Sequence, residues 1–125
     1  MRTAWRRLTW CVVAGWLACC APGVVRAQSQ QEMNRDAERD FASADTELNK
    51  VYKTLCAKME GEDLEELRAA QRVWVQFRDA QAKYEADLAA RGGSMHPMVY
   101  ESRRAELTQT RTADLRRLLK DEDGG

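Results

Sequence analysis

The polar side chains with the most distinctive placement lie beside apolar residues at helical spacing. Asp45 and Asn49 are one helical turn apart and share a face with Leu48 and Tyr52. Four further polar residues lie in or beside such stripes: Gln71, Arg78, Asp79 and Arg111. Because an unpaired charge is costly to bury, these residues should either pair with one another or serve a binding surface.

The first interpretation of this polar set is a lock that fixes the register of neighbouring helices. Asp45 would then bond to an arginine of another helix, and Arg111 is the best candidate because it lies four residues from both Leu107 and Leu115. Arg78 would pair inward or extend outward to solvent, and Asp79 would pair at the side. The second interpretation makes Asp45 an acid that binds a partner protein.

The residue types give little support for catalysis or metal binding. Beyond residue 27 the chain holds one histidine, His96, and one cysteine, Cys56, forty positions apart. No His, Cys or Asp cluster has metal-ligand spacing, and no glycine-rich loop precedes a helix. We therefore predict that the protein is not an enzyme and takes no metal or cofactor.

A small-residue segment, Gly92-Gly93-Ser94-Met95-His96, is the most prominent loop. Exposed loops on a rigid scaffold often carry recognition. The alternative is a plain connector whose glycines allow the turn. The candidate partner-binding residues are Arg91, Ser94, Met95 and His96.

Three helices must position these residues. Apolar residues recur at steps of three and four over 28–60 and 64–91, and Pro97 can open a third helix. Gly61 and the pair Gly92-Gly93 interrupt the pattern. The fold class is therefore predicted as all-α, an antiparallel bundle of about three helices in which the two long helices form a hairpin. The predicted core residues are Leu48, Tyr52, Trp74, Phe77, Leu107 and Leu115. The predicted seam of the second helix is Leu67, Ala70, Trp74, Phe77, Gln81, Tyr84 and Leu88.

The first 27 residues are typical of a secretory signal peptide. A basic start precedes an apolar stretch, Leu8 to Ala21, which is short for a membrane span. We predict cleavage after Ala27 and a mature domain over 28–125 that is periplasmic or secreted and has no membrane span. The alternatives are a retained anchor and lipid attachment at Cys19 or Cys20.

Charge gives a further constraint on the mature domain. The whole chain has 20 basic and 20 acidic residues, and four of the basic ones lie in the predicted signal peptide. The mature domain would keep 16 basic and 20 acidic residues, which gives a net charge near −4. Such a domain is a poor nucleic-acid binder and would be drawn to basic partners. Cys56 is then the single cysteine, either a buried small side chain or an intermolecular pairing site, and the oligomeric state is open.

Five segments in order carry a resemblance to a known family. They are Met33-Asn34, Ala44-Asp45-x-x-Leu48-Asn49-x-x-Tyr52, Ala70-Gln71-Arg72-x-Trp74-x-x-Phe77-Arg78-Asp79, Gly92-Gly93-Ser94-Met95 and Leu107-Thr108-x-x-Arg111-x-x-x-Leu115. Together they resemble the LprI-like lysozyme inhibitor N-terminal domain, an exported bacterial helical domain. Similar proteins carry cysteines near three of these segments, and this chain has none there.

The resemblance implies an exported binding protein that blocks lysozyme. Animal lysozymes are basic and hold two carboxylates in their cleft, so a mildly acidic domain would be steered to them and a loop could occlude the cleft. Arg91 and the segment Ser94 to His96 are the residues expected to insert. The alternative function is a periplasmic structural or adaptor module that binds another envelope protein through a helical face.

Overall fold

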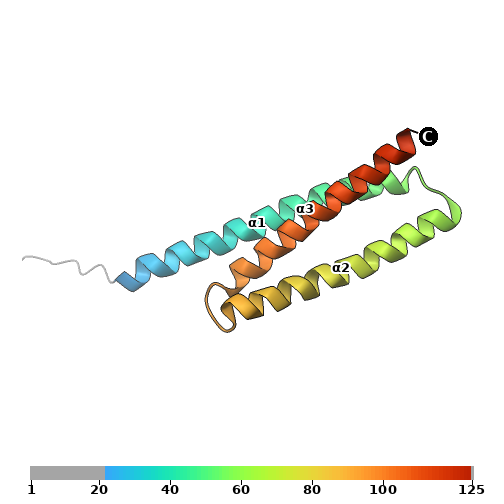
Figure 1. Cartoon of the computed structure of the whole chain (residues 1–125). Coiled ribbons are helices and arrows are strands. Elements are labelled where there is room, and N and C mark those ends of the chain that lie inside the picture. The colour runs from blue at the N-terminus through green and yellow to red at the C-terminus, as the bar shows by residue number, and fades with distance from the viewer. Residues whose placement is uncertain (1–21, 125) are drawn as a thin grey trace, which may run out of the picture.

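Three helices make up the protein in the computed structural model, which describes residues 22–124. They are α1 (Pro22–Cys56), α2 (Gly61–Ala90) and α3 (His96–Asp123), joined by two short turns (Figure 1). Within the described residues there is no strand, which confirms the predicted all-α class. Most of the predicted signal peptide, residues 1–21, lies outside the described residues, and cleavage after Ala27 stays a prediction.

The helix boundaries differ from the predicted ones in ways that local chemistry explains. Helix α1 ends at Cys56 instead of residue 60, and Gly61, with φ of +57°, begins α2 three residues before the predicted start at residue 64. Pro97 lies in the first turn of α3 as predicted. Helix α3 continues to Asp123, and Leu118 and Leu119 near its end still pack on the core.

Helix α3 is the central element of the arrangement. It packs along α1 and also on α2, whereas α1 and α2 make little direct backbone contact (Figure 1). The predicted pairing of the two long helices is therefore wrong in detail, because α3 is the principal partner of each. Because these two helices make little backbone contact, the polar contacts between α1 and α2 are important for holding them together.

Aliphatic side chains from all three helices form the core. It consists of Leu48, Val51, Leu55, Leu67 and Leu115. Leu48 and Leu115 are thus buried as expected, while Tyr52, Trp74 and Leu107 are half-buried. None of the helices in the described part of the chain is long and apolar enough to cross a membrane.

The exposed position of Phe77 shows that the predicted orientation of α2 is wrong. Phe77 is 53% exposed, and Tyr84 and Leu88 of the predicted seam are exposed as well, because α2 turns a different face inward. The buried residues of that inward face are Leu67, Gln71, Arg78, Ala82 and Ala86. Apolar residues recur at helical spacing on both faces of α2, so periodicity alone could not choose between them.

Candidate functional site

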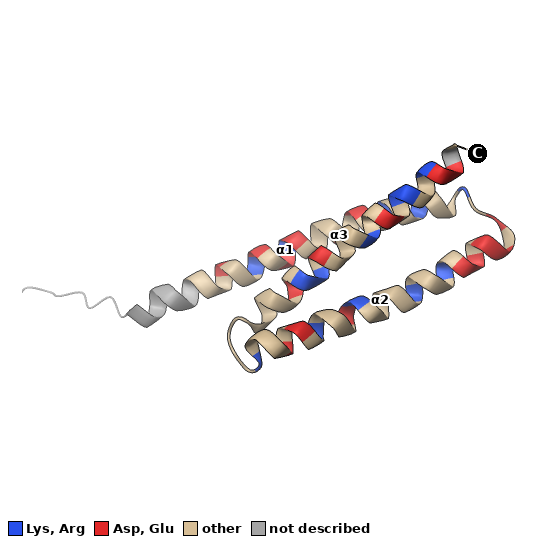
Figure 2. Cartoon of the chain, in the orientation of Figure 1, with Lys and Arg blue, Asp and Glu red and all other residues tan. Residues whose placement is uncertain are grey.

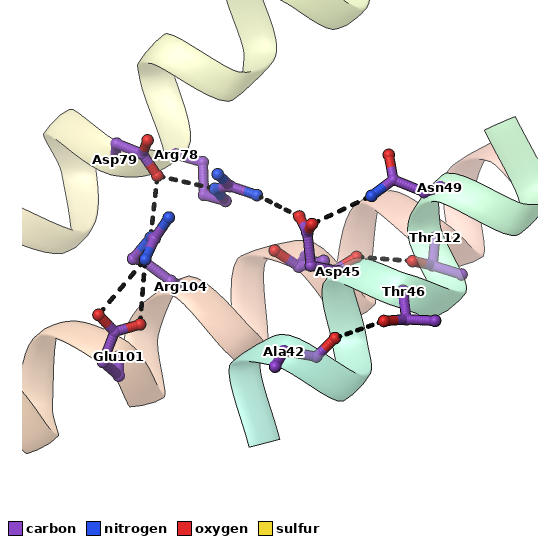
Figure 3. A network of polar contacts seen from close by, with 10 residues as sticks. Ala42, Asp45, Thr46, Asn49, Arg78, Asp79, Glu101, Arg104 and Thr112 are labelled. Atoms are coloured by element: carbon purple, nitrogen blue, oxygen red, sulfur yellow. Dashed lines mark hydrogen bonds and ion pairs between the residues drawn. The ribbon is translucent and has the colours of Figure 1, made fainter. Parts of the chain in front are cut away.

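A buried arginine joins α2 to α1. Arg78 is only 4% exposed, and its Nη1 donates to Oδ1 of Asp45 at 3.0 Å (Figure 3). Its Nε donates to Oδ1 of the neighbouring Asp79 at 2.9 Å. On α1, Asn49 donates from Nδ2 to the other oxygen of Asp45 at 3.0 Å. The guanidinium therefore has a charged partner on each of two helices.

Asp79 extends this network to α3. The oxygen of Asp79 that accepts from Arg78 also accepts from Nε of Arg104 at 3.0 Å, and Arg104 pairs with Glu101 one turn earlier at 3.1 Å (Figure 3). Burial alone would raise the pKa of Asp79, but the hydrogen bonds and charges of Arg78 and Arg104 outweigh it and hold that pKa below its ordinary value. The ionised carboxylate thus links α2 to α3.

Aromatic rings stack between these guanidinium groups. The guanidinium carbon of Arg104 lies 3.7 Å from the ring centroid of Phe41, and that of Arg78 lies 5.0 Å from the same ring. Arg78 is also 5.4 Å from the ring of Trp74. Each such contact adds about 0.5–2 kcal/mol depending on its burial. The alternating series runs Tyr100, Arg104, Phe41, Arg78, Trp74 and Arg111.

The predicted pairing of Arg111 with Asp45 is wrong. Arg111 instead donates from Nε to Oε1 of Gln71 at 3.1 Å and lies 5.8 Å from the ring of Trp74. The reason is geometric, because Asp45 faces Arg78 of α2 while Arg111 lies further along α3. The predicted polar set therefore divides into an Asp45–Asn49–Arg78–Asp79 group and a Gln71–Arg111 pair.

Sequence reasoning missed three members of this network, which are Phe41, Glu101 and Arg104. Their local signals exist, since Glu101 and Arg104 are spaced as a helical ion pair. Phe41 belongs to the apolar stripe of α1. Spacing within one helix, however, carries no information about which helix supplies the partner.

The turn between α2 and α3 is exposed along its whole length. Residues 91–95 are all exposed, and Met95 keeps 48% of its surface in solvent. Gly92 has φ of +70°, which favours glycine. The amide of Gly93 donates to the carbonyl of Ala90 at 2.9 Å, and that of His96 donates to the carbonyl of Gly93 at 3.2 Å. The turn is thus short, internally bonded and presented at the end where α2 meets α3 (Figure 1).

His96 closes this turn against α2. Its Nε2 lies 2.9 Å from Oδ1 of Asp87, whose other oxygen accepts from Nζ of Lys83 at 2.6 Å. The hydrogen bonds from Lys83 and then His96 lower the pKa of Asp87. The half-buried histidine therefore anchors the turn, while Arg91, Ser94 and Met95 project into solvent.

A pocket of about 450 Å³ lies beside the anchored histidine. Its lining residues are Asp79, Ala80, Lys83, His96 and Tyr100. Asp79 and His96 thus share a hollow, whereas Asp45 is not part of its lining. The lining residues include no serine, threonine or cysteine. Among the residues that the structure describes, no group of three His, Cys, Asp or Glu side chains is arranged to hold a metal.

The protein is thus a small three-helix protein with two distinctive features. One is the interior arginine–carboxylate network, and the other is the exposed, internally bonded turn between α2 and α3. Comparison with known proteins gives the family. Residues 20–115 match the family described as "Lysozyme inhibitor LprI", and the chain belongs to that family.

One curated relative is the "Uncharacterized protein R02472" of Rhizobium meliloti (strain 1021). It is 38% identical to this chain over 126 residues, a region that covers 83% of this chain and 90% of the relative. No solved structure matches the chain.

Proposed function

We propose that the protein inhibits lysozyme and that the turn between α2 and α3 is the segment that occludes the active-site cleft. Membership of the lysozyme inhibitor family supports the activity. The observation that carries the choice of segment is the turn itself, with five consecutive exposed residues, 91–95, held between two long helices.

Preorganisation is the physical reason to choose this segment. A flexible loop would lose conformational freedom on binding, and that loss reduces affinity. Here the bonds of Gly93 and His96 to nearby carbonyls and the contact between His96 and Asp87 already fix the backbone. The turn can enter a cleft with little further ordering.

The side chains on the turn suit an acidic cleft. Lysozymes of the retaining type act with two carboxyl groups close together in the cleft. Arg91 offers a guanidinium that can donate two hydrogen bonds to one carboxylate, and Ser94 offers a hydroxyl. Met95 is flexible and apolar and can fill an irregular gap near a sugar-binding surface. His96, anchored to Asp87, sets the base of the inserted segment.

We infer further that the protein acts outside the cytoplasm, where lysozyme meets the cell wall. The basic and apolar start of the chain supports export through a signal peptide of residues 1–27. The net charge near −4 of residues 28–125 supports electrostatic attraction to basic lysozymes.

Clearing of a peptidoglycan suspension by lysozyme tests the proposal. The purified protein should slow clearing in proportion to its concentration, and the triple variant Arg91→Ala, Ser94→Ala, Met95→Ala should be weaker by at least tenfold, about 1.4 kcal/mol of binding free energy. The matched control is Met33→Ala with Arg117→Ala, which removes an exposed methionine and an exposed arginine elsewhere. Absence of inhibition by folded protein would overturn the activity and favour an adaptor role, and equal inhibition by the triple variant would overturn the choice of segment.

A further inference from the structure

Helix α2 carries four large apolar side chains on the outside. Val73, Phe77, Tyr84 and Leu88 are 65%, 53%, 59% and 67% exposed, and Ala80 lies exposed among them. These five residues, which we call the outer α2 face, recur at steps of three or four and so form one stripe. An apolar stripe of this kind is unusual on a helix that is not covered by another element.

The outer α2 face has a symmetric order of residues. Phe77 and Tyr84 are equally far along the chain from the midpoint between Ala80 and Gln81, and Val73 and Leu88 are also equally far from it. A second α2 helix that runs antiparallel across this midpoint would place Phe77 opposite the second copy's Tyr84. It would likewise place Val73 opposite the second copy's Leu88. A twofold interface requires this reciprocity of positions.

Size complementarity along the stripe agrees with this arrangement. The bulky residues lie toward the ends of the outer α2 face, and the small Ala80 lies next to its centre. A small residue at the crossing point lets two helices approach closely, while the aromatic residues on either side can stack in offset or edge-to-face pairs.

Charge favours the antiparallel direction over the parallel one. Figure 2 shows acidic residues at the end of α2 next to the turn from α1. A parallel pair would set the two acidic ends against each other. An antiparallel pair separates them and sets each one toward the other end of the second copy, where Lys83 and Arg91 balance Glu85 and Asp87. It also opposes the helix dipoles. The acidic residues of this end, which precede the first basic residue of α2, are Glu62, Asp63, Glu65 and Glu66.

We propose that the outer α2 face binds a second copy of this chain and forms an antiparallel α2–α2 dimer. The four large side chains expose roughly 400 Å² per copy, about half of the 800 Å² per partner of a standard interface. The dimer is therefore weak, and it forms at concentrations on the order of 10–100 μM. This association does not rest on the proposed inhibition of lysozyme.

Sedimentation velocity on the purified protein tests the dimer. The wild-type protein should shift from monomer to dimer as its concentration rises to about 500 μM. Phe77→Glu should raise the dissociation constant at least tenfold, because it puts a charge among the apolar side chains of the interface. Met33→Glu, which adds the same charge at an exposed position of α1, should leave it unchanged.

A pair of double variants tests the register. In the antiparallel register, Phe77→Glu with Tyr84→Lys sets each new glutamate opposite a new lysine, and this variant should dimerise more tightly than Phe77→Glu with Tyr84→Glu. Phe77→Glu with Tyr84→Glu sets acid against acid and should be monomeric. Circular dichroism should show all variants helical, since both positions are exposed.

Three outcomes would overturn the proposal. They are a wild-type protein that stays monomeric at all concentrations, a dimer that Phe77→Glu does not weaken, and equal behaviour of the two double variants. The last outcome would place any association outside this register.

Discussion

Nη1 of Arg78 donates to Oδ1 of Asp45 across 3.0 Å, although 33 residues separate them in the chain. This contact joins α2 to α1, two helices that otherwise have little backbone contact. Arg78 is buried, whereas Asp45 keeps 38% of its side-chain surface in solvent. The stability of the three-helix arrangement should therefore depend on the arginine more than on either of its carboxylate partners.

Replacing Arg78 by methionine should lower the free energy of unfolding by about 2–3 kcal/mol. Breaking a fully buried pair costs roughly 3–5 kcal/mol, and the smaller value is expected because Asp45 and Asp79 are solvated enough to bear the loss. Urea denaturation measures the change. Arg39→Ala, which removes an exposed ion pair with Asp36, is the control and should change the value by about 0.5 kcal/mol or less. Equal effects of the two variants would show that Arg78 is not a structural link.

The stability of the protein should fall in acid partly through Asp79. The pKa of Asp79 is lowered in the folded state from its ordinary value of 3.8. The ionised carboxylate therefore stabilises the fold at pH values above this ordinary pKa. Its contribution to the free energy of unfolding is lost as the pH falls through the lower pKa of the folded state. Asp79→Asn should be less stable than wild type at pH 7, and the gap should shrink at lower pH. A gap in unfolding free energy that stays constant from neutral pH into strong acid would contradict this assignment.

Two buried threonines of α3 should respond in opposite ways to substitution by valine. Among the described residues, Oγ1 of Thr108 is buried without a hydrogen-bond partner, whereas Oγ1 of Thr112 donates to the carbonyl of Thr108 at 2.8 Å. Thr108→Val should be neutral or stabilising by about 1 kcal/mol, because it removes an unsatisfied polar atom. Thr112→Val should be destabilising by about 1 kcal/mol, because it removes a made hydrogen bond. Thermal melts of both variants give the comparison, and a destabilised Thr108→Val would contradict the account of that site.

Alanine substitutions at the two glycines that flank α2 should distinguish an effect on stability from an effect on lysozyme inhibition. Gly61 and Gly92 both have positive φ, so alanine at either position should cost about 1–2 kcal/mol of stability. The change at Gly92 should also weaken lysozyme inhibition, because it alters the proposed inhibitory turn. The change at Gly61, at the other end of α2, should not. Parallel measurements of melting temperature and inhibition check this, and equal inhibition by the two variants would argue against the turn.

Helix positions could be predicted from the sequence because apolar periodicity and glycine breaks act locally. Two features depend on tertiary contacts and could not be predicted. The outward position of Phe77 follows from which of two apolar faces of α2 packs on α3, and the pairing of Arg78 with Asp45 follows from the order of the helices in space. The exposed turn could be located in advance because two consecutive glycines mark the end of a helix. The anchor of His96 on Asp87 could not, since that bond spans the turn.

The most direct test of the proposed inhibition uses a short soluble chitooligosaccharide as the lysozyme substrate, because binding to the cell wall then cannot slow the reaction. If the exposed turn enters the cleft, the protein should inhibit hydrolysis competitively, raising KM without changing kcat. The triple variant of Arg91, Ser94 and Met95 should lose at least tenfold in inhibition constant. Undiminished hydrolysis in the presence of folded wild-type protein would contradict the account.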